Sequence, residues 1–359
     1  MPRYEAVAIH RSDALLEALA GEARIGVDTE FMREKTYYAQ LCLVQVAAGS
    51  RICCVDPLAG SAPAEFWPAL MTPAWVLHSG RQDLEVVSQA ARQLPQAICD
   101  TQIAAALLGY PPQMGYANLV AELFGVALAK SQTRADWSRR PLPAAALDYA
   151  AEDVEHLLPA WQELGERLER RGRLGWAMED SADLLEPALY RADIDNAVER
   201  VKGARNLRGR ARRAAVGLAR WREQQAETKD RPRQWILRDA VLLQIAGNDP
   251  TSRQQLANIP ALPESTVRRA ADELLDILRE ARVSTDDYEP PARPGEAEKA
   301  LLKDMQHAVQ RCADELGIAA EVLAPRKDLA SALGGARNSR VFRGWRRQLV
   351  GEELLRMLP

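Results

Sequence analysis

The sequence contains no long apolar run and no cysteine pair with a redox or metal-binding spacing. No stretch approaches the roughly 20 consecutive apolar residues that span a bilayer, which excludes a membrane-spanning helix. The N-terminus lacks the basic and then apolar segments of a signal peptide, so we expect a cytoplasmic protein with no membrane partner. The cysteines have no CxxC spacing, and we predict that they are reduced, buried thiols: Cys42, Cys53, Cys54, Cys99 and Cys312.

Charge of one sign does not dominate the chain, because the net charge is only −3 over 359 residues. Its distribution is uneven, since residues 148–199 are rich in acids while residues 201–213, VKGARNLRGRARR, contain six Lys or Arg and no acid. Across residues 201–240 there are twelve basic and four acidic side chains. The segment is either an electrostatic contact for nucleic acid or a solvated arginine-rich linker, and charge alone does not decide between them.

The length predicts two or three domains, and the apolar pattern predicts that they differ in class. Up to about residue 110, short apolar runs bounded by Gly, Pro and Ser predict strands: RIGVDTEF, QLCLVQVA, RICCVDP, WVLHS and AICD. Short connections between the first three favour an antiparallel meander. The run RQDLEVVSQAARQL has helical period, with Leu84, Val87, Ala91 and Leu94 on one face. We therefore expect a mixed sheet flanked by helices.

From about residue 143 onward the pattern is almost entirely helical. The Pro-rich polar stretch at 284–296, STDDYEPPARPGE, predicts a linker, and residues 297–359 then form a third, small helical unit. Trp221 and Trp235 are interpreted as core anchors of the helical part rather than as stacking platforms.

The stretch GVDTEF at residues 26–31 places two carboxylates on a strand that is otherwise apolar. Asp28 and Glu30 are two residues apart, so their side chains point to the same face of the strand. Two like charges beside apolar neighbours repel each other and are costly to desolvate. Bound cations would remove this cost, although a strand face turned to solvent would also tolerate the pair.

Two further acidic positions fit the same chemistry. Asp83 lies in the first turn of a helix just past a strand end, and Tyr149 and Asp153 are four residues apart on one helix face. Together with Asp28 and Glu30 they offer the oxygen ligands that Mg²⁺ or Mn²⁺ prefers. Two such ions about 3.5–4 Å apart can clamp a phosphoryl displacement. Taken singly, Asp83 is also explained as a helix-start residue and the Tyr149–Asp153 pair as a surface pair.

The combination of these motifs resembles a known enzyme family. VDTEF, HSGRQDLEV and YAAEDVEHLLP resemble, in order, the three exonuclease motifs of the DEDD superfamily. Tyr149, four residues before Asp153, marks the tyrosine-type branch, whereas Asp148 occupies the position at which the other branch has His. Residues 130–142, KSQTRADWSRRPL, resemble a stretch of ribonuclease D, and residues 218–260 resemble its helicase-and-ribonuclease-D C-terminal (HRDC) domain.

The resemblance implies a ribonuclease H-like α/β exonuclease domain followed by one or two small all-α HRDC-like domains. The expected boundaries are 1–200 for the exonuclease, 201–290 for an HRDC domain and 291–359 for a degenerate second copy. It implies that two divalent cations, Mg²⁺ or Mn²⁺, are ligated by the four carboxylates and that Tyr149 orients or helps to deprotonate the attacking water. These ligands are Asp28, Glu30, Asp83 and Asp153.

The implied activity is a 3′→5′ exoribonuclease that releases nucleoside monophosphates and trims structured RNA, with tRNA precursors as the leading substrate and a monomer as the active form. A 3′→5′ DNA exonuclease and a non-catalytic RNA-binding scaffold are the alternatives. Near the motifs, residues that could contact the terminal nucleotide are Phe31, Met32, Gln45 and His78. Basic residues that could contact phosphates include Lys202, Arg205, Arg208 and Arg210.

Each of these residues also has a structural interpretation. Phe31 and Met32 could pack in the core, and Gln45 could be merely structural. His156, three residues after Asp153, is interpreted as structural or surface-exposed rather than as a general base. Asp100 is expected to cap the helix that follows it.

Overall fold

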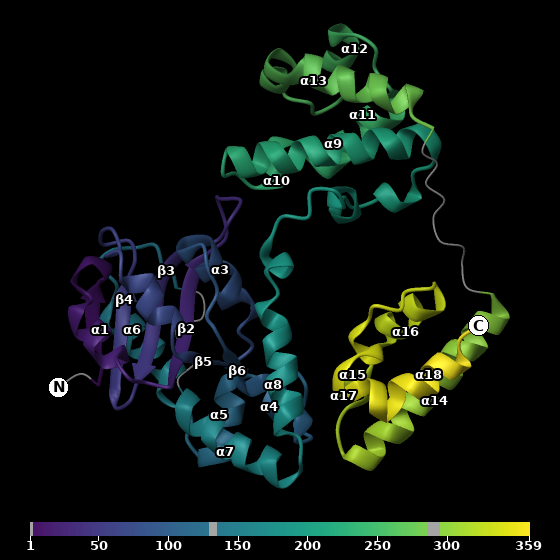
Figure 1. Cartoon of the computed structure of the whole chain (residues 1–359). Helices are drawn as coiled ribbons and strands as arrows, with labels where there is room; N and C mark the ends of the chain where they lie inside the picture. The colour runs from purple at the N-terminus through teal and green to yellow at the C-terminus, as the bar shows by residue number, and fades with distance from the viewer. Residues whose placement is uncertain (1–2, 129–134, 286–294) are drawn as a thin grey trace. The chain divides into compact units, whose positions relative to one another are not determined.

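The computed structural model describes residues 3–128, 135–285 and 295–359 and divides into two compact units (Figure 1). One unit combines Met1–Met32, Leu41–Tyr190 and Pro294–Pro359. The other combines Arg33–Gln40 with Arg191–Arg293. Residues 129–134 and 286–294 lie outside the described residues, and with them part of the 130–142 stretch and most of the expected 284–296 linker.

The first unit contains a six-stranded mixed sheet in the order β1-β4-β3-β2-β5-β6. The strands β3 and β4 are antiparallel, whereas β1 pairs with β4, β2 with β5 and β5 with β6 in parallel. The predicted mixed sheet is confirmed. The first three predicted strands, β2, β3 and β4, are neighbours in it, and β3 and β4 are antiparallel as predicted. An additional short edge strand, β1, was not predicted. The strands are Glu5–Ala8, Arg24–Met32, Gln40–Ala48, Arg51–Asp56, Ala74–Leu77 and Ile98–Asp100.

Helices pack on this sheet and close its core. The helices α1 to α8 are Asp13–Leu19, Phe66–Met71, Arg81–Ala91, Thr101–Leu107, Tyr116–Phe124, Ala144–Glu155, Leu157–Arg170 and Leu174–Ala182. The predicted helix at α3 is confirmed but ends at Ala91, because Arg92 adopts a left-handed backbone conformation with φ 59°. Leu94 therefore lies beyond the helix, and its predicted place on the helical face is wrong.

Gly26 in β2 permits a close approach between the sheet and the junction of α6 and α7. A Cβ atom at this position would lie 3.2 Å from the Cβ of Leu157 and 3.4 Å from the carbonyl oxygen of Val154. The separation from Leu157 is tighter than ordinary van der Waals contact, and that from Val154 lies at its lower limit. The absent side chain thus lets the C-terminal end of α6 lie against the strand that carries Asp28, which brings Asp153 close to it.

The C-terminal helices share a core with the sheet of the first unit. Leu302, Met305 and Leu354 are buried in the same apolar cluster as Val76 and Cys99 of the sheet. The helices α14 to α18 are Glu296–Leu316, Ala320–Leu323, Arg326–Leu333, Gly344–Arg346 and Glu352–Met357, with a π-helical turn at Arg347–Gly351. This last segment is therefore an integral part of the first unit.

An ion pair inside this unit joins α8 to α17. The guanidinium of Arg346 contacts both oxygens of Asp180 at 2.5 and 2.6 Å, and Trp345 donates to the same carboxylate at 3.0 Å. The rings of Trp345 and Trp176 stack in parallel with centroids 4.5 Å apart. Because Asp180 and Arg346 are both buried, loss of either partner would leave an uncompensated charge.

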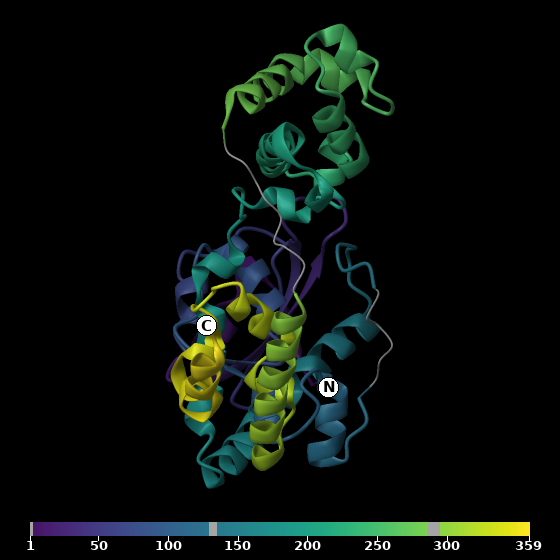
Figure 2. The same ribbon diagram turned by 90° about the vertical axis from the view of Figure 1, so that its right-hand side faces the viewer.

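The second unit is a small helical bundle with its own apolar core. Its helices α9 to α13 are Gly209–Thr228, Arg233–Ile236, Asp239–Asn248, Arg253–Ala257 and Glu264–Val283. The long helices α9 and α13 lie side by side, and both views show α9 to α13 gathered in one cluster (Figure 1, Figure 2). Leu218, Ile245 and Leu274 are fully buried between them. The prediction of an all-helical second half is confirmed for the described residues.

The predictions about thiols and apolar runs can also be compared with the structure. None of the five cysteines, all of which lie in the described residues, forms a disulfide, and Cys312 is the one that is only partly buried. Among the described residues, no helix combines the length and apolar character needed to cross a membrane.

Candidate active site

The two carboxylates of β2 meet a third carboxylate from α6. Asp28 and Glu30 are half-buried, at the end of a strand whose earlier residues Ile25 and Val27 are fully buried. Asp28, Glu30 and Asp153 each place a carboxylate oxygen within 4.8 Å of the others. Asp28 and Glu30 therefore share a face as predicted, and Asp153, which is 125 residues after Asp28, completes the cluster.

Asp83 lies beside this group without being part of the tight cluster. It is buried in the first turn of α3, and its Oδ1 accepts a hydrogen bond of 2.5 Å from the hydroxyl of Thr29. Thr29 is the residue between Asp28 and Glu30, so the same strand segment supplies two carboxylates and orients a third. Its role was missed from the sequence, although the residue is part of the DTE motif.

Tyr149 and Asp153 are joined across one turn of α6, as their spacing predicts. The Tyr149 hydroxyl hydrogen-bonds to the Asp153 carboxylate and lowers its pKa, partly opposing the effect of burial. Burial and the charges of Asp153 and Glu30 raise the pKa of Tyr149 itself far above neutral pH. The hydroxyl therefore keeps its proton and acts as a donor at neutral pH.

Burial raises the pKa of every carboxyl group in this site. At Asp28 the charges of Asp83, Asp153 and Glu30 add to burial, and its pKa lies well above the usual range. The pKa of Glu30 rises to about 8 and that of Asp153 to about 7. Burial raises the pKa of Asp83 only to about 6, because the hydrogen bond from Thr29 stabilises its charged form.

This donor set fits hard divalent cations. Four neighbouring carboxylates that are partly desolvated repel one another, and their charged forms are favourable only when a positive charge lies among them. The cluster of Asp28, Glu30 and Asp153 supplies oxygen ligands and contains no thiol or imidazole, which are the ligands that softer metals prefer.

Asp100 fixes the turn that leads into α3. Its buried carboxylate accepts backbone hydrogen bonds from Gln102 and Ile103, which confirms the predicted cap of α4. It also accepts from the backbone of Ser79 at 3.1 Å and Gly80 at 3.0 Å. Asp100 therefore holds together the starts of two helices, one of which carries Asp83, and this second function was not predicted.

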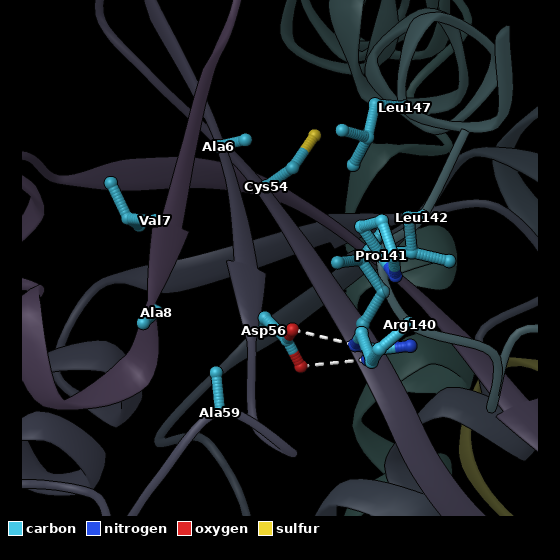
Figure 3. Close-up of a pocket in the computed structure, with 11 residues that line it drawn as sticks. Ala6, Val7, Ala8, Cys54, Asp56, Ala59, Arg140, Pro141, Leu142 and Leu147 are labelled. Carbon is cyan, nitrogen blue, oxygen red and sulfur yellow. Dashed lines mark hydrogen bonds and ion pairs between the residues drawn. The ribbon is translucent and has the colours of Figure 1, made fainter. Parts of the chain in front are cut away.

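An apolar pocket of about 550 Å³ lies beside the segment that leads into α6 (Figure 3). Arg140 closes one side of it with hydrogen bonds of 2.6 and 2.7 Å to the two oxygens of Asp56 in β4. The same guanidinium donates to the carbonyl groups of Cys42 and Trp137. The described part of the 130–142 stretch is thus anchored to the sheet immediately before the helix that carries Tyr149.

The two histidines near the motifs are held by protein groups. His78 Nε2 lies 2.8 Å from the carbonyl oxygen of Met114, and Nδ1 lies 2.9 Å from the hydroxyl of Thr101. A carbonyl only accepts, so Nε2 carries a proton, and burial lowers the pKa of the ring. The ring of His156 lies against Phe124, with centroids 5.9 Å apart. These contacts give both histidines structural roles.

The residues predicted to contact the terminal nucleotide differ in exposure. Phe31 and Met32 are half-buried directly after Glu30, and Met32 packs against the apolar cluster of Cys42 and Trp137. Gln45 is 0% exposed, and within the described part of the chain neither polar atom of its amide has a hydrogen-bond partner. Its burial gives no support to a nucleotide contact.

In the second unit the predicted phosphate-binding residues differ in exposure and in ion pairing. Lys202, Arg205 and Arg208 are exposed, although Arg205 also lies 3.4 Å from the carboxylate of Glu199, and Arg210 is 2.6 Å from the carboxylate of Asp249. The neighbouring basic residue Arg212 is buried. The segment is therefore only partly available to a ligand.

The two tryptophans of this unit also differ. Trp221 is 8% exposed and donates to Glu273, which agrees with its predicted place in the core. Trp235 is 60% exposed on the four-residue helix α10, with the guanidinium carbon of Arg231 5.9 Å from its ring centroid. The prediction that Trp235 anchors the core is wrong, because its side chain lies in solvent while the next residue of the helix, Ile236, packs against the core.

Comparisons with known proteins agree with this geometry. A family model described as 3′-5′ exonuclease matches residues 8–169, and a model of the HRDC domain matches residues 213–278. The ribonuclease D of Xanthomonas oryzae pv. oryzae is 37% identical over 346 residues, which cover 94% of this chain and 94% of that protein. The ribonuclease D of Pseudomonas paraeruginosa is 36% identical over 363 residues, with 97% and 96% covered. The chain belongs to the ribonuclease D family.

Solved structures give the same result. The crystal structure of Escherichia coli RNase D, described as an exoribonuclease involved in structured RNA processing, has a TM-score of 0.88 and 29% identity, and the match covers 99% of this chain and 98% of that one. The predicted fold class is confirmed, and the chain is a ribonuclease D-like exoribonuclease, a hydrolase of phosphodiester bonds. The exonuclease fold of this family implies divalent metal ions, and the acidic cluster supplies ligands for them.

Proposed function

We propose that this ribonuclease uses two divalent cations, Mg²⁺ or Mn²⁺, to release nucleoside 5′-monophosphates from the 3′ ends of structured RNA such as tRNA precursors. The convergence of Asp28, Glu30 and Asp153 within 4.8 Å, with Asp83 beside them, carries the proposal. The description of the E. coli relative as acting in structured RNA processing supports the substrate class. We further propose that the enzyme acts as a cytoplasmic monomer.

Each side chain has a separate task in this proposal. The four carboxylates hold the cations, which when bound neutralise the developing charge of the phosphodiester and lower the pKa of the attacking water. Tyr149 keeps its proton at neutral pH and orients that water, while its hydrogen bond to Asp153 fixes the carboxylate. In this proposal Phe31 and Met32, which directly follow Glu30, contact the terminal nucleotide.

A cleavage assay with end-labelled RNA and DNA of the same sequence tests this proposal. With Mg²⁺ or Mn²⁺ we expect a ladder from RNA that starts at the 3′ end, and EDTA should abolish it until either metal is restored. A ladder from DNA alone would favour the DNA exonuclease, and binding without cleavage would favour the scaffold. Full activity after exhaustive chelation would contradict the role of the cations.

Asp28→Asn tests the same proposal by removing one metal ligand. It also removes one of the repelling buried charges, so the variant should lose turnover while keeping RNA affinity. In EDTA its unfolding temperature should be no lower than that of the wild type. A variant that unfolds would instead show that this carboxylate is required for the fold.

A further inference from the structure

The loop that follows the catalytic strand belongs to the HRDC unit. The residues Arg33–Gln40 directly follow β2, which ends at Met32, and lead into β3. Their contacts nevertheless assign them to the unit formed by Arg191–Arg293. Glu30 is thus three residues from a segment that the helical unit holds.

The first of two tyrosines in this loop is held by a buried glutamate. The Tyr37 hydroxyl donates to Oε1 of Glu223 in α9, whose side chain is 1% exposed. Arg233 contacts the other oxygen of Glu223 at 2.6 Å, and its guanidinium carbon lies 5.0 Å from the Tyr37 ring centroid. Arg200 adds a contact of 3.1 Å to Oε1. The Tyr37 hydroxyl therefore bonds to a carboxylate that two arginines also contact, and one of these arginines lies near its ring.

The second tyrosine and the backbone are held one turn further along α9. The Tyr38 hydroxyl donates to Glu227. Asp230, two residues beyond the end of the helix, accepts backbone hydrogen bonds from Tyr37 at 2.9 Å and Tyr38 at 3.4 Å. The two rings pack edge to face with centroids 4.7 Å apart. We call Tyr37, Tyr38, Glu223, Glu227 and Asp230 the tyrosine latch.

The charges in the latch support a permanent contact at neutral pH. Burial alone would raise the pKa of Glu223, but the hydrogen bonds from Arg233 and Tyr37 outweigh burial and lower it, so the group stays ionised. Burial and the bond to Glu223 raise the pKa of Tyr37, which therefore remains a donor. Hydrogen bonds to an ionised, buried acceptor are about twice as strong as neutral ones.

We propose that the tyrosine latch positions the end of the catalytic strand for RNA that is bound by the HRDC unit. The segment held by the latch continues directly from the strand that carries Asp28 and Glu30. In this proposal the HRDC helices bind the RNA upstream of its 3′ end, and the latch thereby orients the strand whose carboxylates act on that end. Tyr37 and Tyr38 are accordingly positioning residues. This inference rests on the proposed exoribonuclease function and on contact between RNA and the HRDC helices. It predicts that the latch matters for a long RNA and not for a dinucleotide.

The double variant Tyr37→Phe, Tyr38→Phe removes both hydroxyl groups and keeps both rings. We expect kcat/KM on a long single-stranded RNA to fall about 10-fold, which corresponds to the loss of about one charge-assisted hydrogen bond in positioning energy. Cleavage of a dinucleotide should be unchanged. Tyr110→Phe is the matched control, because its hydroxyl contacts Arg167 at 2.9 Å in the first unit and it should affect neither substrate. Equal loss on both substrates would overturn the proposal.

A charge exchange provides an independent test with full-length protein. Tyr38→Glu should repel Glu227 and slow cleavage of long RNA, and the added Glu227→Lys should restore it. Hydrogen exchange measures the latch without any activity: residues 33–40 should be protected in the wild type, exposed in Tyr38→Glu and protected again in the pair. A lack of protection in the wild type, or a lack of rescue, would contradict the latch. If the wild type shows protection but cleaves no RNA, the proposed function fails while the contact itself stands.

Discussion

At the scale of single residues, the active site is a set of crowded, partly buried carboxylates that is unfavourable without a counterion. Asp28, Glu30 and Asp153 share a small volume, and the pKa of each is raised by burial and by its neighbours. Thr29 and Tyr149 each donate to one carboxylate of the site, Asp83 and Asp153 respectively, and keep it in a fixed orientation. The side chains are therefore held in place before a cation binds, which reduces the cost of binding it.

Tyr149→Phe tests whether the hydroxyl group is needed beyond this support. Phe keeps the ring beside Trp137 and deletes the donor to Asp153, so the variant should fold normally and bind metal and RNA. We expect turnover to fall on the order of 10²–10³-fold, the effect of losing one positioned catalytic group. Single-turnover cleavage with saturating Mn²⁺ measures this, with His156→Ala as the comparison. Wild-type turnover by Tyr149→Phe and an inactive His156→Ala would show that the histidine is the base.

The residues of the motifs were predictable because their chemistry follows from short spacings. The two-residue spacing of Asp28 and Glu30 fixes a shared strand face, and the four-residue spacing of Tyr149 and Asp153 fixes a shared helix face. The functions of Thr29, Asp100 and Gly26 could not be derived in this way. Each depends on a partner far along the chain, such as Asp83 for Thr29 or Leu157 for Gly26.

At the scale of elements, the exposed surface of the second unit differs from what composition indicates. Arg210 and Arg212 add to the basic composition of the segment, yet in the fold they form ion pairs with Asp249 and Glu199. Trp235 counts as a core residue by its apolarity, yet the short helix α10 leaves it in solvent. Periodicity does not specify burial for a helix of four residues, and composition does not specify ion pairing.

The exposed groups of this unit give a prediction about salt. The triple variant Lys202→Ala, Arg205→Ala, Arg208→Ala should bind single-stranded RNA more weakly and with a smaller salt dependence, by about 0.7 in the logarithmic slope for each phosphate that is no longer neutralised. Trp235→Ala should weaken binding without changing the slope, since stacking releases no counterions. Titrations at several salt concentrations measure both.

Arg279→Ala is the control for this salt experiment, because it removes an exposed cation on α13 that pairs with Asp276 and lies outside the basic segment 201–213. We expect its affinity and slope to match the wild type. If the triple variant keeps the wild-type slope, the basic segment does not contact RNA.

At the scale of the whole molecule, the chain order and the structural units do not coincide. The HRDC unit is inserted between two parts of the first unit, and the last 66 residues return to the exonuclease core. A Pro-rich stretch predicted a linker before a separate third domain with the boundary 291–359, and that boundary stays a prediction. The shared core could not be derived from the sequence, because the helical period of α14 shows an apolar face without showing what covers it.

This arrangement predicts that two deletions of the chain differ in their effect on the stability of the first unit. Removal of residues 294–359 exposes the faces that bury Leu302, Met305 and Leu354, each worth about 1.5–3 kcal/mol, and deletes Arg346 from beside Asp180. We expect the free energy of unfolding to fall by about 5 kcal/mol or more, which lowers the unfolding temperature by roughly 10–20 °C or prevents folding.

By contrast, replacement of residues 191–293 by a Gly/Ser linker of about 20 residues removes a unit with its own core. This second variant should keep its unfolding temperature and its cleavage of a dinucleotide while losing affinity for long RNA. Calorimetry of both variants decides the question, because an unchanged transition in the protein that lacks residues 294–359 would show that the C-terminal helices are dispensable for the exonuclease fold.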